Sequence, residues 1–459
     1  MTTTRLRLAI GKSVLIAATA LTAAQIASFA PTPAAYAATS TINVTVDGVA
    51  QSGWNVKVIG KTEYVTAQAL ADAIGASAEW DSQRKTATLT QGPRVVQLSA
   101  DSTSAIVNGE RAKLAAAPVA EKGELWVPAA AVGQLFGAAV TDNAAAGTLG
   151  VTPRLHPFVL ANGRAGYVNV FGETVIAAQY EEANGFHEGL AIVKKDGKYG
   201  YINAHGEAAI ALAFDAAYDF ADGVALAEKD GVSFYIDAEG KTVLTPQGYD
   251  ELYDFSEGLA LVRKGDSFGY IDHAGKEVVA PKFEDAFYFS QGLAAVQIDG
   301  RYGYIDRKGA IAIPAIYQSA SDFSEGAGLV QAEGENGEGS FKFVNAKGEA
   351  ALAPAYAKAF SFSEGLAAVE TDGTFFYVDA KGKTVLATEY EDAGSFHEGL
   401  AAFEENGLYG YINRKGEVVI PAQFDSAGDF DRGFAIVTNP LGSFAINAKG
   451  TILGEVSAK

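Results

Sequence analysis

Along most of the chain, short runs of alternating hydrophobic and polar residues are separated by turn residues. Residues 292–296 alternate and predict a strand, and Asp299-Gly300 predicts a two-residue hairpin turn. Residues 302–305 predict the returning strand, and residues 310–313 predict a third strand that ends at Pro314. Residues 317–323 then connect to the next unit, so the pattern predicts a β-structure of three short strands.

This three-strand pattern recurs nine times. The segment Tyr304-Ile305-Asp306-x-x-Gly309 returns, in steps of 34 to 39 residues, at Tyr167, Tyr201, Tyr235, Tyr270, Phe343, Tyr377, Tyr411 and Ala445. A fixed period of this length indicates a repeat architecture, in which each unit buries its apolar face only by stacking on its neighbours. We predict a mainly β array over residues 154–454, as an open or gently curved solenoid. A closed, propeller-like ring is the alternative, but propeller blades usually have four strands.

Two further features recur with the strands. An Asx residue is followed three positions later by glycine in every unit, as in Asp306 and Gly309, which is typical of a capped turn. A calcium site is the alternative interpretation, but one Asx per unit provides few of the six to eight oxygens that calcium needs. Aromatic residues six positions apart, such as Phe283 and Phe289, link consecutive units and predict contacts between them.

Residues 40–152 show a different pattern and predict a small, internally duplicated α+β domain. Each half is expected to contain short strands, a helix and a further strand. In the first half, Thr66 is the expected N-cap of the helix, and Gly75 is its expected C-cap. In the second half, Pro128 is expected in the first helical turn and Gly137 at the C-cap.

Residues 1–37 predict a secretory signal peptide. Arg5, Arg7 and Lys12 precede an uncharged, mostly apolar stretch, and Ala35-Tyr36-Ala37 provides a small-x-small cleavage site. An uncleaved anchor helix is the alternative, although the apolar stretch is short for a membrane span. We therefore expect a secreted protein that is extracellular or associated with the cell wall, without membrane insertion once the signal is removed.

Charge and composition narrow the classes of partner. The 459 residues carry a formal net charge of -20, which disfavours nucleic acids and anionic membrane surfaces as partners. The length predicts at least two domains, and the 48% hydrophobic content argues against wholesale disorder. The chain contains no cysteine, which excludes disulfides and thiolate metal sites.

We find no pattern of residues that predicts catalysis, a metal site or a cofactor. Gly265-Asp266-Ser267-Phe268-Gly269 matches the G-x-S-x-G nucleophile elbow, but Ser267 occupies a hairpin position that other units fill with Lys198 or Arg301. His187 and His397 occupy a variable position before Glu-Gly, where a surface role is favoured over metal binding. The prediction is therefore a protein that is not an enzyme.

Two family resemblances follow from these residues. Asp47-Gly48, Tyr64-Val65 and residues 70–81 resemble the copper amine oxidase N-terminal-like domain, which implies a stalk or attachment role on a bacterial surface protein. The oxidase chemistry of that family belongs to a different domain. The 34-residue unit resembles the WG (KWG) repeat, whose members are mostly interaction modules. The Trp-Gly of that family is written here as Tyr199-Gly200, Phe268-Gly269, Tyr302-Gly303 and Tyr409-Gly410.

We therefore expect a non-catalytic interaction or scaffold protein, whose partner is a surface protein or a cell-wall glycan. The alternative is a lectin-like array that binds glycans. The candidate ligand-binding residues are the aromatics at the tryptophan position, Tyr199, Phe268, Tyr302 and Tyr409. Packing inside the array competes with this interpretation, because each of them shares a strand face with the next-but-one residue.

Overall fold

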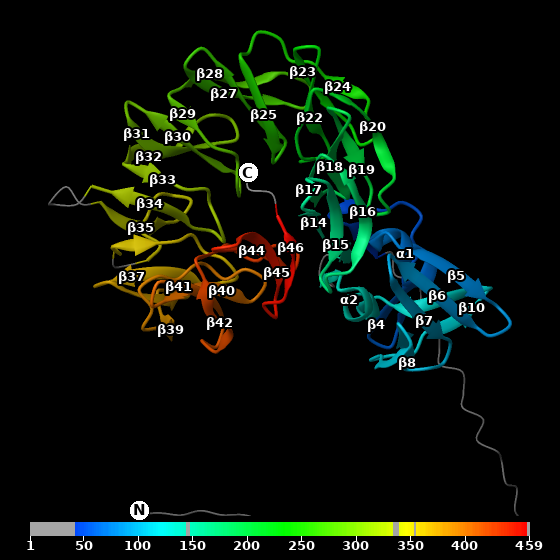
Figure 1. The fold of residues 1–459 in the computed structure, drawn as a ribbon. Helices are drawn as coiled ribbons and strands as arrows, with labels where there is room; N and C mark the ends of the chain where they lie inside the picture. Colours follow the sequence, from blue (N-terminus) through cyan, green and yellow to red (C-terminus); the bar gives the residue numbers. More distant parts are fainter. Residues whose placement is uncertain (1–41, 144–146, 334–338, 353–354, 457–459) are drawn as a thin grey trace, which may run out of the picture. The chain divides into compact units, whose positions relative to one another are not determined.

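The computed structural model describes residues 42–143, 147–333, 339–352 and 355–456 (Figure 1). The predicted signal peptide lies outside the described residues. The described part contains two helices, α1 (Ala67–Ile74) and α2 (Ala130–Phe136), of eight and seven residues, and neither is long enough to cross a membrane.

The N-terminal domain has three sheets, with strand orders β12-β13-β1-β2, β10-β11-β4-β3 and β5-β6-β7-β8-β9. Its strands are β1 (Asn43–Val46), β2 (Val49–Ala50), β3 (Lys57–Ile59), β4 (Thr62–Thr66), β5 (Ser77–Asp81), β6 (Thr86–Gln91), β7 (Arg94–Ser99), β8 (Ser104–Val107), β9 (Glu110–Lys113), β10 (Val119–Glu121), β11 (Glu124–Pro128), β12 (Ala139–Asn143) and β13 (Thr148–Thr152).

The predicted duplication of this domain is confirmed, because β4-α1-β5 and β11-α2-β12 repeat the same order. The Thr66 side chain accepts a hydrogen bond from Ala69 N and caps α1. Gly75 and Gly137 end the two helices with φ angles of 70° and 74°. The prediction for Pro128 is wrong, since Pro128 is the last residue of β11 and pairs with Tyr64. Pairing with β4 therefore outweighs the preference of proline for a first helical turn.

In the described residues, the repeat array contains nine small antiparallel sheets, numbered here in chain order (Figure 1). Sheets 1 to 3 are β14 (Leu155–Val159), β15 (Ala165–Asn169) and β16 (Thr174–Tyr180); β17 (Glu182–His187), β18 (Leu190–Lys195), β19 (Lys198–Ile202) and β20 (Ala208–Phe214); and β21 (Ala216–Ala217), β22 (Ala225–Lys229), β23 (Val232–Ile236) and β24 (Thr242–Leu244). Sheets 4 to 6 are β25 (Glu251–Ser256), β26 (Leu259–Lys264), β27 (Ser267–Asp272) and β28 (Glu277–Phe283); β29 (Asp285–Ala286), β30 (Leu293–Ile298), β31 (Arg301–Asp306) and β32 (Ile311–Tyr317); and β33 (Ser319–Ala320), β34 (Gly328–Ala332) and β35 (Ser340–Val344). Sheets 7 to 9 are β36 (Lys358–Ala359), β37 (Ala367–Thr371), β38 (Thr374–Val378) and β39 (Thr384–Ala387); β40 (Leu400–Glu405), β41 (Leu408–Asn413) and β42 (Val418–Phe424); and β43 (Ser426–Ala427), β44 (Phe434–Asn439), β45 (Gly442–Asn447) and β46 (Ile452–Glu455).

The connecting segments contribute a strand that the sequence pattern did not reveal. In sheet 5, Asp285 and Ala286 of β29 pair with Gln297 and Val296 of β30. Six of the nine sheets therefore have four described strands, each following its neighbour in order. The prediction of three strands per unit is wrong for these sheets. In sheets 3, 5, 7 and 9 the added strand has two residues, too few to show an alternating pattern, whereas β17 and β25 of sheets 2 and 4 have six.

The outer strand of a regular sheet contains a bulge opposite the glycine of the Trp-Gly position. In sheet 5, Tyr302 pairs with Tyr317 and Tyr304 pairs with Ile313, so residues 314–316 form a bulge opposite Gly303. A Cβ on Gly303 would lie 2.5 Å from the carbonyl oxygen of Ile313, which explains the glycine. Pro314 falls inside this bulge and the strand continues beyond it, so the predicted strand end at Pro314 is wrong.

Consecutive sheets are joined by buried aromatic residues. The tyrosine at the position of Tyr270 is present in seven of the nine sheets and is almost fully buried there. Its ring contacts a phenylalanine of the next sheet, as Tyr270 contacts Phe289 at 4.8 Å. Its hydroxyl donates to a backbone carbonyl of the next sheet, as Tyr270 does to Phe287 at 2.7 Å. The prediction that the repeated aromatics link neighbouring units is confirmed.

The array closes on itself, because its first and last sheets are in contact. Strands β14 and β46 touch each other, and Asn447 Nδ2 of sheet 9 donates to Val170 O of sheet 1 at 3.1 Å. Gly172 packs against Leu453, just as Gly450 packs against Ile420 one sheet earlier. The β-repeat array is confirmed, but its preferred open form is wrong, and the propeller-like alternative describes it better. The error follows from the missed strand, because a four-stranded unit is a regular propeller blade.

The repeated Asx residues cap turns in the way that the sequence predicts. Asp306 Oδ1 accepts backbone hydrogen bonds from Lys308 N at 2.9 Å and Ala310 N at 3.0 Å. Gly309 closes the turn with a φ angle of 78°. Because two backbone N–H groups already donate to the Asx oxygen, capping of the turn is favoured over calcium binding as the role of this side chain.

Candidate functional site

The four aromatic residues at the tryptophan position lie half-buried on the second hairpin strand of their sheets. The three tyrosines among them donate their hydroxyls to carboxylates of the same repeat. The acceptors are Glu182 for Tyr199 at 2.8 Å, Asp285 for Tyr302 at 2.7 Å and Asp392 for Tyr409 at 2.9 Å. Burial, together with the hydrogen bond to Asp285, raises the pKa of Tyr302 to about 12. These rings are thus held in fixed positions, with one edge turned inward.

Two of the four rings have a second aromatic residue beside them. Phe268 lies 6.3 Å from Tyr253 between ring centroids, and Tyr302 lies 6.1 Å from Phe287. These pairs are in sheets 4 and 5, which are adjacent, and Phe287 is 38% exposed. No described aromatic ring forms such a pair with Tyr409, because Gly394 occupies the corresponding position. The four residues therefore fall into two kinds.

Tyr253 and Phe287 belong to a larger set that sequence reasoning missed. Each member stands two residues before the buried phenylalanine that joins its sheet to the one before. We call this set the aromatic arc; its members are Tyr218, Tyr253, Phe287 and Phe360 of sheets 3, 4, 5 and 7. Tyr218 and Phe360 are 46% and 42% exposed. The sequence shows these residues as an aromatic residue two positions before a phenylalanine. The spacing alone does not show which of the two aromatic side chains faces solvent.

Charged groups lie beside the rings of sheet 4. Glu251 accepts hydrogen bonds from Arg263 and from the Tyr253 hydroxyl. The hydrogen bond from Arg263 lowers the pKa of Glu251 to about 2, so this carboxylate stays ionised at any ordinary pH. Aromatic faces next to fixed carboxylate and guanidinium groups can stack on a flat apolar ligand face and hydrogen-bond its polar edge.

The residues considered for catalysis and metal binding do not form a site in the described structure. Ser267 begins β27 and pairs with Lys264 across a hairpin, whereas a nucleophile elbow lies between a strand and a helix. His187 and His397 are on the surface and lie 3.6 Å and 3.4 Å from Asp219 and Asp429. Within the described ranges, no group of three or more His, Asp or Glu side chains is placed to hold a metal ion.

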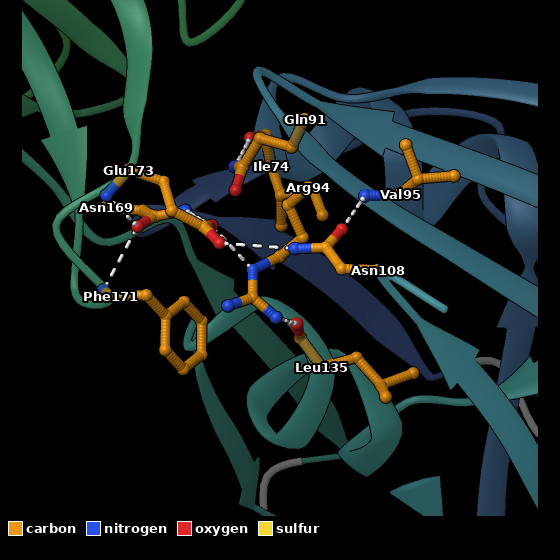
Figure 2. Close-up of polar contacts among 9 residues, drawn as sticks. All are labelled: Ile74, Gln91, Arg94, Val95, Asn108, Leu135, Asn169, Phe171 and Glu173. Atoms are coloured by element: carbon orange, nitrogen blue, oxygen red, sulfur yellow. Dashed lines mark hydrogen bonds and ion pairs between the residues drawn. The ribbon is translucent and has the colours of Figure 1, made fainter. Parts of the chain in front are cut away.

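A second polar cluster joins the N-terminal domain to sheet 1. Arg94 is 9% exposed, bonds to Glu173 at 2.7 Å and donates to Leu135 O at 3.2 Å. Its guanidinium lies 3.7 Å above the ring of Phe171, and Asn108 Nδ2 reaches Glu173 at 3.5 Å (Figure 2). This buried cation has a carboxylate, a carbonyl and an aromatic face of the same chain as its partners. The cluster is therefore a structural contact between the domain and the array.

Two family models match the chain. The copper amine oxidase N-terminal domain matches residues 50–151, and the WG containing repeat matches eight times between residues 166 and 439. Each WG match begins on the second hairpin strand and continues into the next sheet, so eight matches run through nine sheets. The WG matches cover more than half of the chain, and they fall on the repeated sheets of the array. The array is therefore a WG-repeat array. The protein belongs to the WG-repeat family and also carries a copper amine oxidase N-terminal domain.

Comparisons beyond the families add little. No curated protein matches the chain. Among solved structures, the crystal structure of the eukaryotic initiation factor is 10% identical with a TM-score of 0.47, covering 65% of this chain and 94% of its own. The dihydro-heme d1 dehydrogenase NirN is 12% identical with a TM-score of 0.36, covering 59% and 73%. Hsv2p of Kluyveromyces lactis is 10% identical with a TM-score of 0.28, covering 56% and 89%. These scores are too low to support any argument about function.

Proposed function

We propose that this protein is a non-catalytic interaction or scaffold protein that acts outside the cell or on its wall. The observation that carries the proposal is the aromatic arc together with the paired rings of sheets 4 and 5. Exposed aromatic residues next to an arginine are typical of protein binding surfaces. The leader-like sequence of residues 1–37 supports a location outside the cell. The absence of catalysis is supported by the two matching families, neither of which contributes a known catalytic residue to this chain.

The test is retention of the purified chain, from residue 38 onward, on cell-wall material and on intact cells. We expect saturable retention that falls at least about tenfold in a Tyr253→Ala/Phe287→Ala variant. The matched control is Ile311→Ala, which removes a 52% exposed aliphatic side chain from the outer strand of sheet 5. Equal retention of all three proteins, or free passage of the wild type, would contradict the proposal.

A glycan-binding function is the second candidate, and the rings of sheets 4 and 5 favour it. Tyr302 and Phe268 present fixed, half-exposed faces, with Asp285 and Glu251 beside them as hydrogen-bond acceptors. Such a set suits the apolar face and the hydroxyl groups of a pyranose ring. A protein partner would instead rely on the same rings without needing the carboxylates.

Two variants distinguish these candidates. If the ligand is a glycan, the Tyr302→Ala protein is expected to lose its retention on protease-treated wall glycan. The Tyr409→Ala protein is expected to be retained as well as the wild type, because sheet 8 has no paired ring. For a protein partner, protease treatment of the wall material abolishes retention of the wild type. Similar losses in both tyrosine variants would contradict a site centred on sheets 4 and 5.

A further inference from the structure

A second contact between sheets recurs around the array and involves a two-residue turn. Each turn pairs a residue X in the left-handed region with a glycine, as in Glu257-Gly258 with φ angles of 52° and 80°. We use the name X-Gly turns for those that lie just before the first strand of a sheet's hairpin, and not for hairpin tips such as Asp299-Gly300, which have a similar conformation. The described part of the array contains eight X-Gly turns, with X at Glu188, Asp222, Glu257, Gln291, Glu325, Glu364, Glu398 and Arg432. In seven of them, the X side chain accepts a hydrogen bond from the glycine N–H of the following turn. The seven acceptor–donor pairs are Glu188–Gly223, Asp222–Gly258, Glu257–Gly292, Gln291–Gly326, Glu325–Gly365, Glu364–Gly399 and Glu398–Gly433.

The two ends of this series do not match each other. Sheet 1 has no X-Gly turn, because Thr152-Pro153-Arg154 leads directly into β14. No repeat therefore supplies an acceptor for the N–H of Gly189, the first glycine of the series. At the other end, X is Arg432, whose guanidinium can only donate. Nine sheets thus provide eight turns, and the missing one belongs between sheets 9 and 2.

Asp47 of the N-terminal domain contacts both ends. Its Oδ2 accepts from Gly189 N at 2.8 Å, and its Oδ1 accepts from Arg432 Nη1 at 2.6 Å. The Asp47 side chain is 4% exposed, so both oxygens are shielded from solvent. An aspartate buried to this degree requires partners, and it has one for each oxygen.

The turn that carries Asp47 has the same backbone conformation as the turns of the repeats. Asp47 and Gly48 connect β1 to β2 with φ angles of 51° and 83°, compared with 52° and 86° for Arg432 and Gly433. Asp47 also performs the same chemistry, since it accepts the glycine N–H of the turn that follows. The N-terminal domain thus reproduces the repeated turn in both geometry and hydrogen bonding.

We propose that the gap between Arg432 and Gly189 is a binding site for an Asp-Gly turn, and that the N-terminal domain occupies it as the ninth X-Gly turn of the ring. Arg432 gives the site its selectivity, because a carboxylate at this position would repel the incoming aspartate. The Arg94 cluster provides a second attachment point on sheet 1 (Figure 2). In this arrangement the N-terminal domain is part of the closed array rather than a separate stalk.

The test compares single and double variants of the chain from residue 38 onward. Arg432→Glu places two carboxylates together, and we expect the Gly189 amide to exchange with deuterium at least about tenfold faster. Asp47→Asn alone keeps an oxygen that accepts from Gly189 but turns an amide N–H2 toward Arg432, so a smaller rise in exchange than in Arg432→Glu is expected. In the Asp47→Asn/Arg432→Glu double variant, the introduced amide donates to the introduced carboxylate, so exchange returns to near the wild-type rate. The control is Glu325→Ala, which removes the same contact inside the array and leaves Gly189 unchanged.

Mass spectrometry of short peptides around Gly189 measures this exchange, and circular dichroism reports whether each variant folds. If Arg432→Glu does not fold, Asp47→Ala provides the same readout, with faster Gly189 exchange expected. Wild-type exchange at Gly189 in Arg432→Glu or in Asp47→Ala would overturn the proposal, as would a double variant that exchanges as fast as Arg432→Glu. A concentration-dependent dimer of the wild type, in which Gly189 protection is lost on dilution, would show that a second copy supplies the turn and would overturn closure by the chain's own domain.

Discussion

The joint between sheets 4 and 5 and the seam, defined as the joint between sheets 9 and 1, solve the same packing problem with different chemistry. Between sheets 4 and 5, Tyr270 packs on Phe289, its hydroxyl bonds Phe287 O, and Ser256 bonds Phe289 O at 2.7 Å. At the seam, Ala445 stands where the tyrosine would be. The contacts there include His156 on Phe434 at 4.9 Å. Arg154, at the edge of the seam just before β14, reaches past sheet 9 to Glu398 of sheet 8 at 2.5 Å.

The difference shows how a repeat array can specify where it ends. An interior joint is mostly apolar and nearly the same from sheet to sheet, so it would accept another sheet of its kind. The seam uses a buried histidine and a partly exposed arginine–carboxylate pair, and another repeat of the interior kind would supply a partner for neither of them. Stability is therefore expected to reside in the interior joints, and selectivity at the seam.

The largest expected effect comes from breaking an interior joint. Phe289→Ala removes a ring that is 1% exposed and is expected to lower the free energy of unfolding by about 3–5 kcal/mol. Arg154→Ala at the seam breaks a partly exposed ion pair and is expected to cost about 1 kcal/mol or less. Urea unfolding followed by circular dichroism measures both. A larger loss for Arg154→Ala would reverse the comparison.

An acid titration is expected to weaken the seam selectively. Burial lowers the pKa of His156 from 6.5 to about 4, opposed by the nearby Asp431 carboxylate. Between these values the unfolded chain binds a proton that the folded chain does not, so stability falls as the pH drops from 6.5 to 4. Below pH 4 the loss is complete, at about 3 kcal/mol.

The variant His156→Leu isolates this contribution from that of the many carboxylates, including Glu398 beside Arg154. Unfolding free energies measured near neutrality, at about pH 5.5 and at about pH 4 are expected to fall less steeply in the variant than in the wild type. The same slope in both proteins would show that His156 is already protonated or solvated in the fold.

A last comparison adds a hydroxylated ring to each kind of joint. Phe343 fills the tyrosine position of sheet 6, and the series of hydroxyl bonds places Phe360 O within reach of a new hydroxyl. Phe343→Tyr is therefore expected to stabilise the fold by about 0.5–1.5 kcal/mol. Ala445→Tyr at the seam is expected to destabilise it by about 1–3 kcal/mol, because Ala445 is fully buried. Thermal melts of the two variants give the signs, and a stabilising Ala445→Tyr would mean that the seam resembles an interior joint.

The sequence predicts the parts of this molecule that are repeated, because repetition makes weak local signals add up. The hairpins, the Asx turns at residues such as Asp306, and the Tyr–Phe contacts could all be read from one unit and applied to nine. The two-residue strands such as β29 could not, since their pairing depends on the hairpin beside them. Ring closure also escaped prediction, because its contacts join residues such as Asn447 and Val170 that are far apart in the chain.

The candidate site was only half-predictable for a similar reason. Spacing identified Tyr302 and Phe268 as repeated aromatics, but their neighbours Phe287 and Tyr253 became visible only when the strands were paired. The role of Asp47 also became visible only in the structure, because the sequence shows it as a turn residue of a separate domain. Its partners, Gly189 and Arg432, lie in the second and last sheets of the array.

The bulge opposite Gly303 has a consequence for the behaviour of the protein in concentrated solution. An outer strand such as β32 exposes backbone N–H and C=O groups to any other chain that could add a strand to it. The bulge interrupts that row of groups, and Pro314 removes one donor from it. Proline also occurs within the bulge in sheets 4 and 8: Pro421 takes the same position as Pro314, and Pro281 lies one residue later. The bulges and prolines thereby protect a protein with many edge strands from forming fibres, without a helix or loop packed over each edge.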